Sequence, residues 1–219
     1  MMKPYPAYKD SGFKWLGEIP SHWEAQRVKY LFQEVDERSK DGEETLLSVS
    51  QYTGVTVRNS DNHSRESESL EGYKVCRPDD FVSNIMLAWM GAFGVTSHHG
   101  IVSPAYCVYR LKGDHNPKYF DYLFHTPRYL AEFARNSTGI ISSRWRFYTD
   151  DFFRIFSILP PREEQDAIVD FIERETAGIN QFLANKRQLI TLLEEQKQVV
   201  INTAMTQGLD SMPRANPPA

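Results

Sequence analysis

The stretch LPPREEQDAIVDFI, residues 159–172, separates two parts of the sequence that have different patterns. Its two adjacent prolines preset the backbone of a first helical turn, and the acidic residues that follow lie where the positive end of a helix dipole favours carboxylates. After this stretch the next proline is Pro213, and Gly178 is the only glycine before Gly208. The stretch therefore predicts that a long helix starts here, after a separate folded region.

Apolar side chains recur along this helix in alternating steps of four and three residues. From residue 168 these positions are Ile168, Ile172, Glu175, Ile179, Phe182, Lys186, Leu189, Leu193, Gln196 and Val200. Seven of the ten are apolar, which is typical of a coiled-coil seam with polar breaks that could set register or pairing direction. At 1.5 Å per residue the helix would be about 50 Å long, too long to pack wholly against one domain of this size. The pattern predicts a partner helix, although the first two turns could pack on their own domain.

The region before the double proline predicts a mixed α+β domain from about residue 10 to residue 161. Between Leu46 and Leu111, short β-branched or aromatic runs alternate with turn-forming residues. These runs are LLSVSQY, GVTVRNS, YKVCRP, DFVSNIML, GAFGVTS and SPAYCVYRL. In HNPKYFDYLFHT and TPRYLAEFARNS, aromatic residues spaced three or four apart follow a proline, which predicts two short helices. The predicted fold class is therefore α+β, with a mixed or antiparallel sheet, short helices and a long C-terminal coiled-coil-type helix.

These patterns divide the 219 residues into a globular domain (1–161), a helical spacer or dimerisation region (162–207) and a proline-rich tail (208–219). We expect the tail to be disordered. The sequence has no run of about 18 apolar residues, and its opening lacks the apolar core of a secretory signal, so we expect a cytoplasmic protein. Cys76 and Cys107 lie in apolar surroundings without CxxC spacing, which predicts buried free thiols.

A search for catalytic and metal-binding patterns finds none. His98 and His99 are adjacent, so on a strand their rings would point to opposite faces, and we interpret them as loop residues. The pair Asp79-Asp80 is interpreted as turn and cap residues. Asp150-Asp151 would mark either the start of a short helix or the end of a strand. We therefore predict no catalytic residues, no metal site and the function of a reader or adaptor.

Charge is distributed unevenly along the chain, whose net charge is -4. Residues 163–219 hold 5 basic and 9 acidic residues, so the negative balance lies there. Residues 110–146, in contrast, hold seven basic and three acidic residues. This local excess fits a surface that meets phosphates, and it fits a solvated mixed-charge surface equally well.

The stretch SSRWRFYTDDFF, residues 142–153, combines arginines with aromatic residues in that basic segment. If it forms a strand, Arg144 and Arg146 lie on one side and Trp145 and Phe147 on the other. The aromatic residues would then anchor the strand in the core, while the arginines would face outward toward phosphate.

Four stretches occur in an order and spacing that is more specific than any one of them. They are WLGEIPSHW (15–23) with RVKYLF after it, GAFGVTSHHGIVSPAYCVYR (91–110), STGIISSRWRFYTDDFFRIFSILPPREEQDAIVDFI (137–172) and AMTQGLD (204–210). Together they resemble the specificity subunits of type I restriction-modification enzymes over about residues 10–210. The strongest single element of this resemblance is the motif LPPxEEQxxI, which precedes the predicted long helix.

The resemblance implies that a globular target-recognition domain reads one half of a split sequence in double-stranded DNA. A complete subunit has two such units, whose long helices pair antiparallel and hold the recognition domains apart. The subunit is not a catalyst. It docks two methyltransferase subunits, which use S-adenosylmethionine to methylate adenine, and motor-nuclease subunits join to cut unmethylated DNA. No cofactor is expected on this chain itself, and no membrane is expected among its partners.

This sequence departs from the family pattern because it holds one recognition domain and one helical region. It stops at SMPRANPPA, so we expect either a natural or a truncated half-subunit. In both cases an apolar seam in water predicts a homodimer, which would read an interrupted palindrome with half-sites on the order of one helical turn apart. The residues expected to face a partner helix are Ile168, Ile172, Ile179, Phe182, Lys186, Leu189, Leu193 and Val200.

The residues expected to contact DNA are those that can present paired donors or acceptors. The first candidates are Arg144 and Arg146, with Ser142 and Ser143 beside them. The second candidates are Arg58, Asn59, Asn62, His63 and Arg65. For each arginine, a surface salt bridge is an equal alternative. For the whole chain, the alternatives are a dimeric coiled-coil adaptor that binds a protein and not DNA, and a small hydrolase, which the missing catalytic pattern disfavours.

Overall fold

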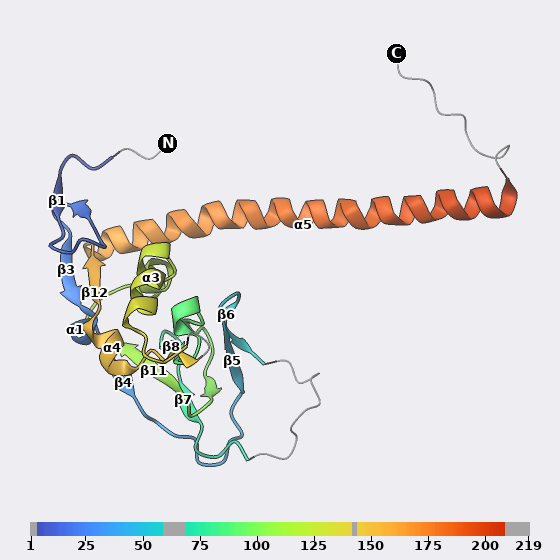
Figure 1. Ribbon diagram of the computed structural model, residues 1–219. Coiled ribbons are helices and arrows are strands. Elements are labelled where there is room, and N and C mark those ends of the chain that lie inside the picture. The colour runs from blue at the N-terminus through green and yellow to red at the C-terminus, as the bar shows by residue number, and fades with distance from the viewer. Residues whose placement is uncertain (1–3, 59–68, 142–143, 209–219) are drawn as a thin grey trace. The chain divides into compact units, whose positions relative to one another are not determined.

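The computed structural model describes residues 4–58, 69–141 and 144–208 (Figure 1). The chain forms two compact units, of which the first reaches Val169 and the second begins at Asp170. The first unit therefore includes the opening turns of the long helix α5 (Arg162–Gln207). The domain boundary at residue 161 and the disordered tail stay predictions, and residues 209–219 of that tail lie outside the described residues.

An antiparallel sheet forms the centre of the first unit, with the strand order β4, β11, β8, β9. These strands are β4 (Phe32–Val35), β8 (Phe81–Asn84), β9 (Phe93–Val95) and β11 (Tyr106–Leu111). β11 is paired on both sides, and Val108 lies opposite Val35 of β4 and Val82 of β8. Neighbouring residues of a strand point to opposite faces, and both faces of this sheet are covered. Phe81 and Tyr109 belong to one hydrophobic core, whereas Val82 and Val108 belong to a second, smaller one.

Two-stranded antiparallel pairs complete the unit (Figure 1). They are β1 (Tyr8–Asp10) with β2 (Glu18–Pro20), β3 (Glu24–Arg27) with β12 (Phe156–Leu159), β5 (Leu47–Ser50) with β6 (Gly54–Val57), and β7 (Lys74–Cys76) with β10 (Gly100–Val102). Each of the six β-rich runs found in the sequence contains one of these strands or of the central ones. The predicted α+β class, with antiparallel strands before a long helix, is confirmed.

Short helices connect and cover the strands. They are α1 (Val28–Leu31), the 3-10 helix η1 (Ala88–Met90), α2 (Pro117–Phe124), α3 (Pro127–Asn136) and α4 (Thr149–Arg154). α2 and α3 begin at their prolines, as predicted, and the Asn116 side chain caps α2 by accepting a hydrogen bond from the Lys118 amide (3.0 Å). Asp150 and Asp151 lie in the first turn of α4, which confirms the helical alternative for this pair.

Phenylalanine rings hold these helices against the sheet. Phe32 of β4 contacts Phe120 of α2 and Phe152 of α4, with ring centroids 5.2 and 5.8 Å apart. Phe81 of β8 stacks on Phe152 at 5.6 Å with an angle of 3° between the rings. Such pairs stabilise a core beyond the area that they bury. The local helix signals near residues 117 and 149 thus become fixed in space through aromatic packing.

The first turn of α5 is held by hydrogen bonds from residues near the start of the chain; we call Tyr5, His22, Trp23 and Glu164 the clasp. The Glu164 carboxylate accepts a hydrogen bond from the Trp23 indole nitrogen (3.0 Å) and lies 2.8 Å from Nε2 of His22. The Tyr5 hydroxyl donates to the other carboxylate oxygen. Burial acts to raise the pKa of Glu164, but these three hydrogen bonds outweigh it and the pKa is lowered.

A second group of contacts fixes the next turn of α5. Gln165 is fully buried, and its side chain accepts from the Asn116 amide (2.9 Å) and donates to the Pro160 carbonyl (2.9 Å). Asn116 in turn donates to the Asp166 carboxylate (2.7 Å). Val169, one turn further, is buried in the larger core. The first two turns of α5 therefore pack on their own domain, and they do so through polar residues of the stretch 159–172.

The second unit presents its apolar side chains to solvent. Ile168, which precedes it, packs against the larger core of the first unit, so the predicted partner-facing seam begins after this residue. Ile172 is half-buried, and Lys186 is exposed. The exposed large apolar residues of α5 are Ile179, Phe182, Leu183, Leu189, Ile190, Leu192, Leu193, Val199, Val200, Ile201 and Met205.

Candidate nucleic-acid interface

The arginine-aromatic segment does not form the predicted strand. Thr138 and Arg146 face each other as an isolated antiparallel bridge, with N–O distances of 2.9 and 2.8 Å in the two directions. A Cβ atom on Gly139 would lie 2.6 Å from the Arg144 carbonyl oxygen, so the backbone passes here at a distance that only a glycine accommodates. The Phe147 amide donates to the Ile85 carbonyl (2.9 Å), which ends the pairing after one bridge. The strand prediction was wrong because of these two tertiary approaches.

The side chains of this segment divide only in part as the strand hypothesis expected, because Trp145, which was expected in the core, is half-buried like Arg146. Phe147 is buried and stacks on Phe133 of α3 at 4.6 Å, whereas Arg144 is exposed. Arg146 is half-buried and donates to the Trp145 carbonyl (2.8 Å). Two of the first candidates, Ser142 and Ser143, lie outside the described residues. The arginines are thus anchored next to a buried aromatic residue.

A second segment, between β8 and β9, meets the first through a pair of tryptophans. The Trp89 and Trp145 rings make an edge contact with centroids 5.2 Å apart. The Trp89 indole donates to the Met86 carbonyl (3.2 Å), which fixes the ring on its own turn. Residues in both segments leave apolar side chains in water, and Ile140 is 97% exposed. We call these residues the tryptophan surface: Met86, Leu87, Trp89, Met90, Ile140, Ile141, Arg144, Trp145 and Arg146.

Sequence reasoning found the arginines of this surface and missed Trp89 and its neighbours. The run IMLAWM, residues 85–90, is a signal that was available, because it places large apolar residues in a segment too short to form an amphipathic helix. Exposed apolar residues that gather in one place are typical of interaction surfaces. Arginines beside exposed aromatic rings can contact phosphates and bases together.

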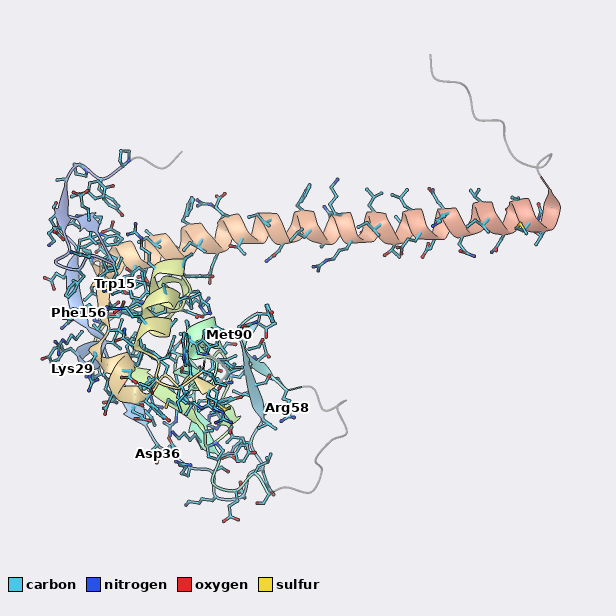
Figure 2. All side chains as sticks on the ribbon, viewed as in Figure 1. Trp15, Lys29, Asp36, Arg58, Met90 and Phe156 are labelled. Carbon is cyan, nitrogen blue, oxygen red and sulfur yellow. The ribbon has the colours of Figure 1, made fainter. Side chains whose placement is uncertain are left out.

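Arg58 is exposed just after the end of β6, at the last described residue before residue 69 (Figure 2). Burial raises the pKa of Tyr106, and the Arg58 charge opposes that rise. Tyr106 is in turn joined to the segment that holds Trp89. Asn84 donates to the Tyr106 hydroxyl (3.3 Å) and accepts from the Met86 amide (3.1 Å). The other second candidates, Asn59, Asn62, His63 and Arg65, lie outside the described residues.

The basic residues between 110 and 146 do not form one surface. Arg110 makes two hydrogen bonds to the buried carboxylate of Asp80, at 2.8 and 2.9 Å. Arg135 is paired with Glu132 in the same way. Lys112 donates to the Lys29 carbonyl (2.7 Å), and Figure 2 shows Lys29 on the opposite side of the first unit from Arg58. For these residues the mixed-charge alternative is the better description, because local carboxylates and carbonyls engage them.

The described residues contain no arrangement typical of a metal centre. No group of three or more His, Cys, Asp or Glu side chains is placed to hold an ion within ranges 4–58, 69–141 and 144–208. His98 and His99 lie in an exposed loop, as predicted. Cys76 and Cys107 are buried free thiols, also as predicted, and burial raises the pKa of Cys76 to about 12. Among the described helices, none is both long and apolar enough to cross a bilayer.

Comparison with known proteins identifies the fold. No protein-family model and no curated protein matches the sequence. Solved structures do match, and what they share with this chain is the fold. The HsdS subunit from Thermoanaerobacter tengcongensis superposes with a TM-score of 0.59 at 17% identity, over 95% of this chain and 54% of that chain.

A second match comes from a structure on complex assembly and conformational transition of the type I R-M system. It has a TM-score of 0.55 at 17% identity, over 91% of this chain and 53% of that chain. The chain therefore spans about half the length of the solved subunits that it matches. What it shares with them is the fold of an α+β domain followed by a long helix, which confirms the fold that the resemblance implied.

Proposed function

We propose that this chain is a specificity subunit of a type I restriction-modification system, and that it reads one half-site of double-stranded DNA per chain. The observation that carries the proposal is the superposition of 95% of the chain on an HsdS subunit. The four sequence stretches support it independently of that superposition. Two of them, residues 15–23 and 137–172, meet where His22 and Trp23 contact the Glu164 carboxylate, so they serve one structural purpose.

DNA contact is assigned to the tryptophan surface and to Arg58. Arg144 is exposed, Arg146 is half-buried, and Trp145, which lies between them in the chain, is a half-buried ring in edge contact with Trp89. A guanidinium can donate two hydrogen bonds to a guanine or bind a phosphate, and both interactions suit an exposed arginine on a rigid base. The packing of Phe147 and Phe133 provides that rigidity.

The chain itself acts without catalysis in this proposal. It docks methyltransferase subunits, which bring S-adenosylmethionine, and motor-nuclease subunits join the assembly. Two copies of the chain associate through α5 with the helices antiparallel, so that the homodimer supplies two half-site readers. The exposed apolar side chains of residues 179–205 support this association, because so long a stripe is costly to leave in water.

The proposal is tested by DNA binding in the presence of the methyltransferase subunit. The double variant Arg144→Ala/Arg146→Ala should weaken binding and reduce the slope of log K against log salt by about 1–2, because each phosphate contact releases counterions. Arg27→Ala is the matched control: its guanidinium lies over Phe156, which is on the opposite side of the first unit from Arg58 (Figure 2). Equal affinity and equal salt slope in wild type and double variant would contradict the assignment.

A second candidate is a dimeric coiled-coil adaptor that binds a protein and not DNA. The composition of the tryptophan surface favours it, because tryptophan, methionine and arginine are enriched in protein interfaces. The same experiment separates the two candidates. A chain that binds the methyltransferase subunit but retains no DNA at low salt supports the adaptor.

A further inference from the structure

The exposed apolar residues of α5 exceed what a two-helix seam uses. Besides the seam residues, six more large apolar side chains of α5 lie in water. They are Leu183, Ile190, Leu192, Val199, Ile201 and Met205. Leu192 is 49% exposed and Val199 is 62% exposed, although flanking positions of paired helices are usually polar. The highest density is in LITLL, residues 189–193, so an occupant of this face must cover that run on both sides of the seam.

The polar residues of the seam exclude one arrangement of two copies. In a parallel, in-register pair each seam residue lies opposite its own copy. Glu175 would then meet the partner's Glu175, and Lys186 would meet the partner's Lys186. Like charges in a partly desolvated seam repel each other without compensation. Reversal of one helix avoids both encounters, and it brings positions reached by a step of four opposite positions reached by a step of three.

We propose that α5 pairs antiparallel with a second copy of this chain in a single register, whose twofold axis passes beside Thr191. The inference rests on the homodimer proposed above and specifies its interface. In this register Lys186 lies opposite the partner's Gln196, so the two polar breaks meet each other. Opposed seam residues are then equidistant from Thr191 along the whole overlap, from Glu175 to Gln207.

The remaining seam layers pair apolar with apolar. Leu189 lies opposite the partner's Leu193, and Phe182 lies opposite the partner's Val200. Each layer occurs twice by symmetry. Ile179 faces the partner's Thr203, whose methyl group can pack against it. All of the exposed seam residues from Ile179 onward are therefore covered within the overlap.

The same register also places the apolar residues beside the seam. Near the axis, Ile190 meets the partner's Ile190 on one side of the seam. Leu192 meets the partner's Leu192 on the other side. Leu183 lies beside the partner's Lys197, whose aliphatic stem can cover it. LITLL crosses the twofold axis in this register, so its apolar residues on both sides of the seam meet their own copies in the partner.

Registers displaced by one heptad fail on the polar breaks. In one direction Lys186 lies opposite the partner's Leu189, and Gln196 lies opposite the partner's Ile179. In the other direction Gln196 lies opposite the partner's Leu193. Each of these layers buries a polar group against a side chain that cannot bond to it, which is unfavourable.

A displacement of three heptads offers the best competitor. It pairs Glu175 with the partner's Lys186 and moves the axis between residues 180 and 181. However, Leu193 would then face the partner's Ile168, which already packs against its own core. Val200 would face residue 161, before the helix begins. An exposed ion pair stabilises less than the burial of a single leucine or valine, so the register with its axis at Thr191 is favoured.

Cysteine cross-linking of the full chain tests the register. Native Cys76 and Cys107 are buried, so a short thiol cross-linker should leave the wild type uncross-linked. Ile190→Cys alone should give a covalent dimer, and Phe182→Cys co-expressed with Val200→Cys should give a mixed dimer. Phe182→Cys alone is the matched negative, because its two copies would be about 27 Å apart along the helix at 1.5 Å per residue.

The other outcomes each overturn the register. A dimer from Phe182→Cys alone indicates parallel pairing, and a mixed dimer of Ile179→Cys with Phe182→Cys indicates the competitor. Sedimentation of the wild type without cross-linker separates this inference from the homodimer itself. A dimer that cross-links at other positions overturns only the register, whereas a monomer at micromolar concentration overturns both.

Discussion

Phe152 and Phe182 have the same side chain, but they lie in two regions of the molecule where it is placed in opposite environments. Phe152 in the first unit is 2% exposed and contacts Phe32, Phe81 and other rings. Phe182 in the second unit is 59% exposed. The first unit satisfies its apolar residues within one chain, whereas the second leaves them for another helix. Folding and association are therefore assigned to separate residues here, so that each can be changed without the other.

The largest expected effect comes from truncating each phenylalanine. Phe152→Ala should lower the free energy of unfolding of the first unit by about 3–5 kcal/mol, because it opens a cavity among packed rings. Phe182→Ala should change that quantity by less than about 0.5 kcal/mol and instead weaken the dimer. All four tryptophans, Trp15, Trp23, Trp89 and Trp145, precede residue 170, so their fluorescence in urea reports the first unit.

Dimer dissociation is measured for the same two variants by sedimentation over a concentration series. Unfolding of the first unit at a lower urea concentration in Phe182→Ala, with the dimer intact, would contradict this separation of roles. An unchanged unfolding midpoint in Phe152→Ala would also contradict it. Protein concentration is kept constant in the urea series, because association stabilises the folded chain by mass action.

Two glutamines on α5, Gln165 and Gln181, show the same contrast within a single helix. Gln165→Ala should lower the stability of the first unit by about 1–3 kcal/mol, because it leaves the Asn116 amide and the Pro160 carbonyl without their side-chain partner. Gln181→Ala removes the same group from an exposed position and should be nearly neutral. Urea unfolding followed by fluorescence measures both. Similar losses in the two variants would mean that the hydrogen bonds of Gln165 do not hold the start of α5 on the first unit.

Local patterns predicted two of the short helices and the long helix correctly, and tertiary contacts decided what those patterns missed. α2, α3 and the start of α5 follow from prolines and residue spacing, which act within one or two turns. The strand expected at Arg144 failed because Gly139 lets the chain approach itself there and the Ile85 carbonyl takes the Phe147 amide. Neither contact leaves a periodic signal in the sequence.

The clasp shows the same limit at longer range. Trp23 and Glu164 are 141 residues apart, and no spacing rule connects them. The joint occurrence of their two motifs was visible, but the hydrogen bond between them was not. In the candidate interface, the arginines were found from composition, whereas Trp89 emerged only when its contact with Trp145 was seen.

The smallest effect separates two glutamates of α5 by their response to pH. The folded-state pKa of Glu164 is lowered, so its stabilising contribution is complete above the unfolded pKa of about 4.3 and is lost as pH falls through the folded value. Glu164→Gln should therefore lower first-unit stability by about 1 kcal/mol near pH 7, where only the wild type has a charged carboxylate to accept from Trp23. The difference should be smaller in acid, because the wild-type carboxylate is then protonated as well. Glu194→Gln, at an exposed position on the same helix, should follow the wild type at each pH. Urea midpoints measured between pH 7 and pH 3 test this prediction. A constant difference between wild type and Glu164→Gln across that range would show that the carboxylate charge does not hold the start of α5. Packing at Val169 and the hydrogen bonds of Gln165 would then retain it instead.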